Sequence, residues 1–249
     1  MFETVTTIVF DLDGTLLNTD DLVINSYREV FKTYRPDYKL SKEEEISFLG
    51  PTLKSMFLKY FNNDMDDLLN TYHDYARKHT LEQAKLYPYA EEILIYLRKK
   101  GYRVILFTSR FKSSCEEMLS SFDLAKYFDM VVTLDEVKNP KPSPEGLELI
   151  KKVYNLQNNQ IIFIGDNKSD LDSGKSAHVY TSLVSWSKGR NNSLLNPDLL
   201  INNFKNYCRN NNISNLKVVA SSKNKNAIEF YRKNGFDDFN LTLTMNIGD

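Results

Sequence analysis

Short, uninterrupted runs of apolar residues alternate with helical patterns along most of this chain. The runs are rich in β-branched residues and lie at residues 7–10 (TIVF), 103–107 (RVILF), 130–133 (MVVT) and 160–164 (QIIFI). Continuous rather than alternating hydrophobicity indicates strands that are buried on both faces, as in a parallel sheet. The intervening residues 89–100 have helical spacing and end at Gly101, a predicted C-cap, and Pro144 suits the first turn of another helix. We therefore predict an α/β fold with a doubly wound, Rossmann-like parallel sheet.

Residues 18–86 interrupt this rhythm with several helical patterns. Tyr27, Phe31 and Tyr34 recur at helical spacing and are expected to form the core of a helical unit. Ser41 and Glu44 have the spacing of a capping box, which predicts the start of another helix. Because ligands bind at the carboxyl ends of strands in open α/β sheets, a helical insertion directly after the first strand indicates a cap over the site; a decoration away from the site is the alternative.

The expected organisation is a core, a cap and a C-terminal extension. The core comprises residues 1–17 and 87–205, the helical cap residues 18–86, and a linker with a small strand–helix–strand unit residues 206–249. The linker is predicted from the asparagine-rich composition of residues 202–215.

Composition restricts the partners that the protein can have. The net charge of −1 argues against a protein that coats nucleic acid or an anionic membrane, but it leaves room for a small anionic substrate. No apolar run approaches the roughly 20 residues that a spanning helix needs, and the N-terminus has no signal-peptide pattern. Cys115 and Cys208 lack zinc-site spacing, which favours a reducing, cytoplasmic compartment. The three histidines share no metal-like spacing, so we expect them in surface or packing positions.

Polar residues follow four of the predicted elements at the point where a strand ends or a helix begins. Asp11 and Asp13 follow the first strand, Thr108 and Ser109 follow the strand at 103–107, and Asp166 and Asp170 follow the strand at 160–164; Lys141 lies in a proline-rich loop before a helix. Because parallel strands end at one edge of a sheet, these side chains are expected to meet there. A turn signal is the plain alternative for the Asp-x-Asp-Gly-Thr segment alone, but four such coincidences are much harder to explain in this way.

The order of these groups resembles the haloacid dehalogenase superfamily. The segment DLDGT, then a hydroxyl residue, then a lysine and then GDxxxD reproduce the four motifs of that family, and the resemblance covers about residues 1–205. Within the family, the segments FLGPTLKSMF and VSWSKGR–NPD look like the phosphoglycolate phosphatase branch and are especially similar to its bacterial inorganic pyrophosphatases.

The resemblance implies a magnesium-dependent phosphohydrolase that acts on a small phosphorylated metabolite or on pyrophosphate. In this reading Asp11 is the nucleophile and forms an aspartyl-phosphate, Thr108 donates a hydrogen bond to the phosphoryl group, and Lys141 supplies positive charge. Ser109 is a further candidate for substrate binding. Mg²⁺ would be held by Asp11, the Asp13 backbone carbonyl and Asp166, with Asp170 positioning the metal shell or Lys141.

Asp13 separates the reaction types of the family. Its carboxyl group can protonate the leaving oxygen and then activate water, whereas members that displace halide lack this aspartate. Two alternatives stay open: a phosphomutase, which uses the same motifs, and a catalytically idle binding module. In the cap, Gly50, Pro51 and Lys54 are candidates for a loop that reaches the substrate, with a helix–helix turn and a solvated lysine as the equal alternative.

Residues 215–245 resemble the C-terminal part of GNAT-type N-acetyltransferases, in which the residue matching Tyr231 is a general acid. The sequence between Gly189 and Gly235 contains no glycine, so the loop that would bind acetyl-CoA is missing and acetyl transfer by this chain alone is not expected. This unit is too small to bury a core of its own. It is expected to dock on the core, to pair with a second copy as a homo-oligomer through its strand edges, or to stay loosely held.

Overall fold

The computed structural model describes residues 4–187 and four strand segments beyond them, residues 199–201, 215–219, 237–239 and 242–246. Six parallel strands form the central sheet in the order β5–β4–β1–β6–β7–β8. Their bounds are β1 (Thr7–Phe10), β4 (Arg103–Phe107), β5 (Met130–Val132), β6 (Ile161–Gly165), β7 (Tyr180–Val184) and β8 (Leu199–Ile201). The predicted doubly wound α/β fold is confirmed, and β7 and β8 extend the sheet beyond the strands that the apolar runs predict.

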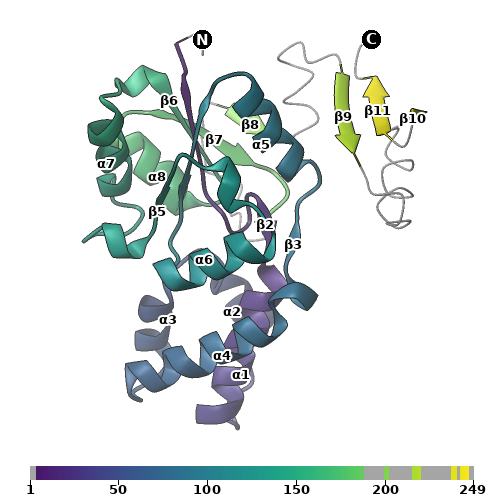
Figure 1. The fold of residues 1–249 in the computed structure, drawn as a ribbon. Coiled ribbons are helices and arrows are strands. Elements are labelled where there is room, and N and C mark those ends of the chain that lie inside the picture. The colour runs from purple at the N-terminus through teal and green to yellow at the C-terminus, as the bar shows by residue number, and fades with distance from the viewer. Residues whose placement is uncertain (1–3, 188–198, 202–214, 220–236, 240–241, 247–249) are drawn as a thin grey trace.

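Helices cover both faces of this sheet (Figure 1). Ile8 and Phe10 of β1 pack in one core with residues of α5 (Ala90–Lys99) and α6 (Lys112–Ser121). Val9, which points to the opposite face, packs in a second core with residues of α7 (Glu145–Tyr154). Because side chains alternate across a strand, burial on both faces explains why the strand sequences are continuously apolar. The helix α8 (Lys168–Ser176) follows β6 and packs against β6 and β7.

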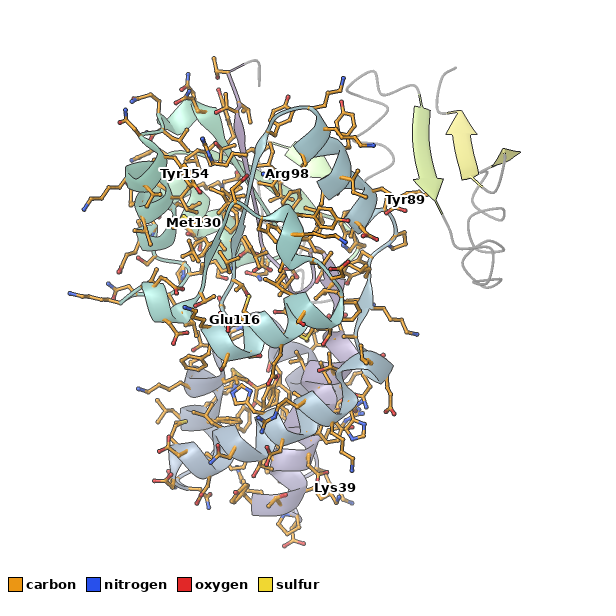
Figure 2. The ribbon with its side chains drawn as sticks, viewed as in Figure 1. Lys39, Tyr89, Arg98, Glu116, Met130 and Tyr154 are labelled. Atoms are coloured by element: carbon orange, nitrogen blue, oxygen red, sulfur yellow. The ribbon has the colours of Figure 1, made fainter. Side chains whose placement is uncertain are left out.

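Asp129, directly before β5, joins elements of the two helical layers. Its carboxylate pairs with Arg98 of α5, and its backbone carbonyl accepts a hydrogen bond of 3.1 Å from the Tyr154 hydroxyl of α7. Arg98 and Tyr154 are both labelled in Figure 2. The guanidinium of Arg103 lies 4.1 Å from the centre of the Tyr154 ring, and this cation–π contact further stabilises the packing around Asp129.

Along the chain, four helices lie between β1 and the next strand of the central sheet, β4. They are α1 (Asp20–Tyr34), α2 (Lys42–Ser47), α3 (Leu53–Tyr60) and α4 (Met65–Gln83), and we refer to them as the helical segment. The short strands β2 (Leu17–Asn18) and β3 (Lys85–Leu86) pair antiparallel where the chain enters and leaves it. Figure 1 shows the helical segment standing at the end of the sheet where β1 runs out, beside α6.

Aromatic packing holds the helical segment together. Tyr27 and Phe31 are buried, as their spacing predicts, and Tyr34 lies at the edge, where its hydroxyl contacts Thr71 at 3.1 Å. The Tyr27 ring stacks on Phe48 with 4.3 Å between ring centres. The predicted capping box is confirmed, since the Ser41 hydroxyl accepts from the backbone N–H of Glu44 and the Glu44 carboxylate accepts from that of Ser41.

The remaining predicted boundaries agree closely with the structure. Gly101 follows α5 with a φ of +80°, and Pro144 is the N-cap of α7, one residue before its first turn. Three 3₁₀ turns lie at Ala125–Tyr127, Leu134–Glu136 and Asn158–Gln160. Among the described residues, no helix is both long enough and apolar enough to span a membrane.

The C-terminal strands form a separate antiparallel sheet in the order β10–β11–β9. Their bounds are β9 (Asn215–Val219), β10 (Asp237–Phe239) and β11 (Thr242–Asn246). The predicted first strand of the strand–helix–strand unit is present as β9, and two strands, β10 and β11, lie where one second strand was predicted. The predicted helix between them, with Tyr231, and the predicted linker at residues 202–215 lie outside the described residues apart from the first residue of β9.

Candidate active site

The loop after β1 places Asp11 close to the end of the neighbouring strand β6. Asp11 leaves the sheet with its N–H donating to the carbonyl of Ile164 at 2.9 Å. Gly14 has a φ of +79°, and a Cβ atom there would lie 2.2 Å from Oδ2 of Asp166. Only glycine permits both this backbone conformation and this close approach. The loop therefore brings Asp11 beside Asp166, which follows β6.

Lys141 links two of the buried carboxylates. Its Nζ atom lies 2.7 Å from Oδ1 of Asp11 and 2.7 Å from Oδ1 of Asp170, and it donates a longer bond of 3.3 Å to the carbonyl of Phe107. The other oxygen of Asp170 accepts from the backbone N–H groups of Asp166 and Asn167 at 3.1 and 3.2 Å. Both oxygens of Asp170 are thus engaged within the protein, and they fix Lys141 against Asp11.

Asp11, Asp166 and Asp170 are buried and each offers an oxygen within 4.8 Å of the others. Burial, together with the neighbouring carboxylates Asp170 and Asp13, raises the pKa of Asp11 to about 7 although Lys141 opposes the shift. Burial and the nearby carboxylates also raise the pKa of Asp166 well above its usual value. Burial alone would lower the pKa of Lys141, but Asp11 and Asp170 outweigh it and raise that pKa.

This crowding of negative charge fits a divalent cation. The donors are hard carboxylate oxygens, the ligands that Mg²⁺ prefers, and the metal-capable group that the described residues form contains no histidine or cysteine. Asp11 and Asp166 line the cavity and can offer oxygens to an ion there, whereas Asp170 lies behind Lys141 and does not line it. The Asp166 carboxylate is itself oriented by the Asn167 amide at 2.9 Å and by the Ser187 hydroxyl.

The Asp13 side chain points away from this carboxylate group. Its two oxygens accept from the Nε and Nη2 atoms of Arg110, each at 2.7 Å, and Oδ1 also accepts from the Thr19 hydroxyl at 2.6 Å. Burial alone would raise the pKa of Asp13, but the Arg110 guanidinium and its hydrogen bonds lower that pKa below its usual value. Asp13 is therefore held as a carboxylate in this structure.

Thr108 and Ser109 directly follow β4 and line the same cavity. The Thr108 N–H extends the sheet by donating to the carbonyl of Val132 at 3.0 Å. Its hydroxyl oxygen accepts from the backbone N–H of Arg110 at 3.3 Å. Because the oxygen is used as the acceptor in that contact, the hydroxyl proton is free to point toward a ligand in the cavity.

The helical segment supplies the opposite wall of the cavity, whose volume is about 130 Å³. Gly50, Pro51 and Lys54 all line it, together with Tyr72 and His73 of α4. Gly50 has a φ of +107°, and a Cβ atom there would lie 3.6 Å from the Asn167 side chain. The loop that carries Gly50 thus lies against the loop after β6. The structure brings all predicted site residues, from sheet and helical segment, to one cavity except Asp170, which lies behind Lys141.

Several cavity residues were missed by the sequence analysis. Arg110 comes directly after the hydroxyl pair and was detectable as a cation at a strand end, whereas Thr19 and Asn167 lie next to recognised motifs without a signal of their own. Ser187, which does not line the cavity but donates to Asp166, follows β7, a strand whose mixed sequence YTSLV gave no continuous apolar run. His73 lies in the cavity wall, and burial, reinforced by Arg110 and Arg77, lowers its pKa.

Comparison with known proteins places this arrangement in a family. A family model described as haloacid dehalogenase-like hydrolase matches residues 8–184. The chain belongs to the haloacid dehalogenase-like hydrolase family. The match ends before the C-terminal strands, so it gives no support to the acetyltransferase-like resemblance of residues 215–245.

Among curated proteins, the chain is similar to the pyrophosphatase PpaX of Bacillus cereus (strain Q1), with 34% identity over 187 residues, which cover 75% of this chain and 86% of that protein. PpaX of Bacillus anthracis (strain CDC 684 / NRRL 3495) matches with the same identity and coverage.

Solved structures of low identity share the fold. A predicted phosphoglycolate phosphatase from Haemophilus somnus 129PT superposes with a TM-score of 0.73 and 20% identity, over 85% of this chain and all of that one. CbbY from Rhodobacter sphaeroides, in complex with phosphate, superposes with a TM-score of 0.70 and 21% identity, over 80% of this chain and 95% of that one.

Proposed function

We propose that this enzyme is a magnesium-dependent phosphohydrolase that acts through an aspartyl-phosphate on Asp11. The observation that carries the proposal is the convergence of Asp11, Thr108, Lys141 and Asp166 on one cavity, from segments that are far apart in the sequence. The family and the PpaX relatives support phosphoester or phosphoanhydride hydrolysis. The same observation speaks against the idle binding module, because the buried ion pairs of Lys141 would stabilise the fold without requiring Thr108 and Asp166 to line the same cavity.

The attacking carboxylate and the phosphoryl group are both anionic, so the site must offset their repulsion. Lys141 is the cation fixed nearest to Asp11, with 2.7 Å between Nζ and Oδ1. We propose that it screens the incoming phosphoryl charge while it orients the nucleophile. The Thr108 hydroxyl oxygen accepts a hydrogen bond from the backbone N–H of Arg110, and its proton is donated to a phosphoryl oxygen.

Mg²⁺ would be held by Asp11, Asp166 and the backbone carbonyl of Asp13, with Asp170 kept for Lys141. A bound Mg²⁺ supplies positive charge that neutralises the phosphoryl oxygens and the nucleophile together. Asn167 and Ser187 fix the Asp166 carboxylate by their hydrogen bonds, which orients it before any metal arrives.

Asp13 lies at the position expected for the residue that acts as acid and base toward the leaving group. It is two residues from Asp11 and lines the same cavity, but its carboxylate faces Arg110 and Thr19. We propose that Asp13, once its carboxylate leaves Arg110 and burial raises its pKa, takes up a proton from solvent and delivers it to the leaving oxygen. The resulting carboxylate then removes a proton from the water that hydrolyses the aspartyl-phosphate.

We propose that the helical segment, within residues 18–86, is a cap that closes over the core formed by residues 1–17 and 87–205. Gly50, Pro51 and Lys54 then contact the substrate, and the small cavity between sheet and helices restricts it to small phosphorylated molecules. The names of the relatives point to pyrophosphate or phosphoglycolate.

The C-terminal sheet adds no activity to this proposal. Acetyl transfer is excluded from it because the glycine-rich loop that binds acetyl-CoA is missing from the sequence. The strand edges of this sheet remain the proposed surface for self-association, and a cytoplasmic location remains a proposal from cysteine usage.

The test is phosphate release with and without Mg²⁺ from a panel of small phosphorylated metabolites that includes pyrophosphate and phosphoglycolate. Asp11→Asn should abolish release and remain folded by circular dichroism, whereas Asp37→Asn, on an exposed loop of the helical segment, should behave as the parent protein. Substantial turnover by Asp11→Asn would remove the nucleophile role. Conversion of a hexose 1-phosphate with a bisphosphate activator, without release of free phosphate, would indicate a mutase instead.

A further inference from the structure

Arg110 is a largely buried cation in the cavity wall that the proposed mechanism leaves without a task. Its side chain is 15% exposed, and its guanidinium donates hydrogen bonds to Asp13 and Ser114. Nε and Nη2 bind the two oxygens of Asp13, and Nη1 donates to the Ser114 hydroxyl at 2.8 Å. These contacts use three of the five N–H groups of a guanidinium.

Arg110 lies next to the residue that is proposed to act on the leaving group of the substrate. Thr108, two residues earlier, is proposed to hold the transferred phosphoryl group, and Asp13 is proposed to serve the leaving oxygen. Because Arg110 contacts Asp13 directly, its guanidinium lies where the group attached to the leaving oxygen would be. His73 and Lys54 line the same cavity from the helical segment.

The charges of the cavity leave Arg110 as the core cation for a second anion. Asp11, Asp13, Asp20 and Asp166 line the cavity and Asp170 lies behind Lys141, which gives five negative charges when all are ionised. Lys54, Arg110 and Lys141 give three positive charges. One divalent cation would balance this difference of two. Lys141 is already fixed between Asp11 and Asp170, so it cannot follow a group on the far side of the leaving oxygen.

The contact between Arg110 and the Asp13 carboxylate indicates which chemical groups Arg110 can bind. A planar guanidinium that donates two parallel bonds to two oxygens of one group has the geometry for a carboxylate or a phosphate. The same two bonds also occupy both oxygens of Asp13, and Thr19 adds a third contact. A substrate anion that replaced Asp13 on Arg110 would therefore release the Asp13 side chain toward the leaving oxygen.

We propose that Arg110 binds a second anionic group of the substrate, carried on the leaving oxygen, and so selects phosphate compounds that have such a group. The inference rests on the proposed hydrolase function and assigns to Arg110 the selection of its substrates, in which a phosphate is joined to a second phosphate or to a short carboxylate. When the second anion of the substrate replaces Asp13 on Arg110, the Asp13 side chain is released toward the leaving oxygen. Recognition of the correct leaving group and release of Asp13 are therefore one event.

The experiment compares substrates that differ in the charge of the leaving group. Pyrophosphate and 2-phosphoglycolate carry a second anion, whereas 2-hydroxyethyl phosphate replaces the carboxylate of phosphoglycolate with an uncharged alcohol. Steady-state kcat and KM are measured with Mg²⁺ for the parent protein, Arg110→Gln, Arg110→Lys and the control Lys112→Gln, an exposed cation of α6 outside the cavity. Circular dichroism confirms that each variant is folded.

We expect Arg110→Gln to lower kcat/KM for the two substrates with a second anionic group by roughly 10- to 100-fold more than for 2-hydroxyethyl phosphate, since charge-assisted hydrogen bonds to the second anion are lost. Arg110→Lys keeps the charge but not the fork, so its loss should be smaller and appear mainly in KM. Lys112→Gln should leave all three substrates unchanged.

Equal losses on the three substrates would overturn the inference, because they would mean that Arg110 acts only by positioning Asp13. A parent protein that prefers 2-hydroxyethyl phosphate to both substrates with a second anionic group would overturn it as well. Absence of Mg²⁺-dependent phosphate release from all three substrates by the parent protein is a different result: it would remove the proposed function and the inference together.

Discussion

The close approach of Gly14 to Asp166 makes a sharp prediction for the variant Gly14→Ala. A Cβ atom at Gly14 would lie 2.2 Å from Oδ2 and 2.6 Å from Cγ of Asp166, so the carboxylate must move. Gly101 is a matched control, because its φ of +80° is nearly the same as the +79° of Gly14 but no atom lies within 4 Å of its added Cβ. Comparison of the two variants therefore separates the backbone cost from the displacement of Asp166.

The magnitude follows from the contacts of Asp166. An alanine in left-handed backbone costs about 1–2 kcal/mol, and this is the whole expected loss for Gly101→Ala. Displacement of the Asp166 carboxylate also breaks the hydrogen bond from Ser187 or from Asn167, and a hydrogen bond to a charged group is worth about 1.5–3 kcal/mol. We therefore expect Gly14→Ala to lower the free energy of unfolding by about 2.5–5 kcal/mol.

Urea denaturation without metal measures this difference, and calorimetric titration with Mg²⁺ measures the second consequence. If Asp166 is a ligand, Gly14→Ala should weaken Mg²⁺ binding by about 10- to 100-fold, as when a ligand loses its orienting partners, while Gly101→Ala should bind as the parent protein does. Equal unfolding free energies for the two variants would refute the steric reasoning. Equal Mg²⁺ affinities would refute the assignment of Asp166 to the metal.

Three further changes test other parts of the structure by urea denaturation. Lys141→Met should destabilise the fold by about 3–5 kcal/mol, since it leaves two buried carboxylates without their ammonium group; a loss below about 1 kcal/mol would contradict the buried ion pairs. Tyr27→Phe should stabilise the protein by up to about 1–3 kcal/mol, because among the described residues the buried Tyr27 hydroxyl has no hydrogen-bond partner; a loss of stability would show that it has one. The pKa of His73 is lowered by burial, so below about pH 6.5 the unfolded chain takes up a proton more readily than the folded one. Protonation of Asp11, whose pKa is raised to about 7, favours the folded chain over the same interval, so the His73 contribution is measured as a difference. The stability of His73→Gln relative to the parent protein should rise as the pH drops from 7 to 5; a constant difference would contradict the shift.

The predictability of the fold has a simple physical origin. Strands covered by helices on both faces must be apolar at every position, so four of the six sheet strands could be read directly from the sequence, including β1 and β6. The strand β7 escaped because its residues Tyr180, Thr181 and Ser182 are polar. Thr181 is buried where Gly174 of α8 comes close to it, a helix–strand contact that no local pattern reports.

Some features of the candidate site could likewise be predicted from the sequence, and others could not. The sequence alone placed Asp11, Thr108 and Asp166 at one edge of the sheet, because residues that follow parallel strands must meet there. It could not supply the distances that distinguish neighbouring roles: Asp170 bound to Lys141 and backbone N–H groups, and Asp13 bound to Arg110 rather than turned toward Asp11.

Local propensity fixes where a strand ends and which residue leaves it, and that was enough to determine the edge of the sheet at which the carboxylates gather. Which side chains then contact one another depends on loops that are packed together from distant parts of the chain, such as the approach of Gly14 to Asp166 and of Gly50 to Asn167. The tertiary structure alone decided that Arg110 binds the Asp13 carboxylate, because that ion pair joins residues separated by 97 positions in the sequence.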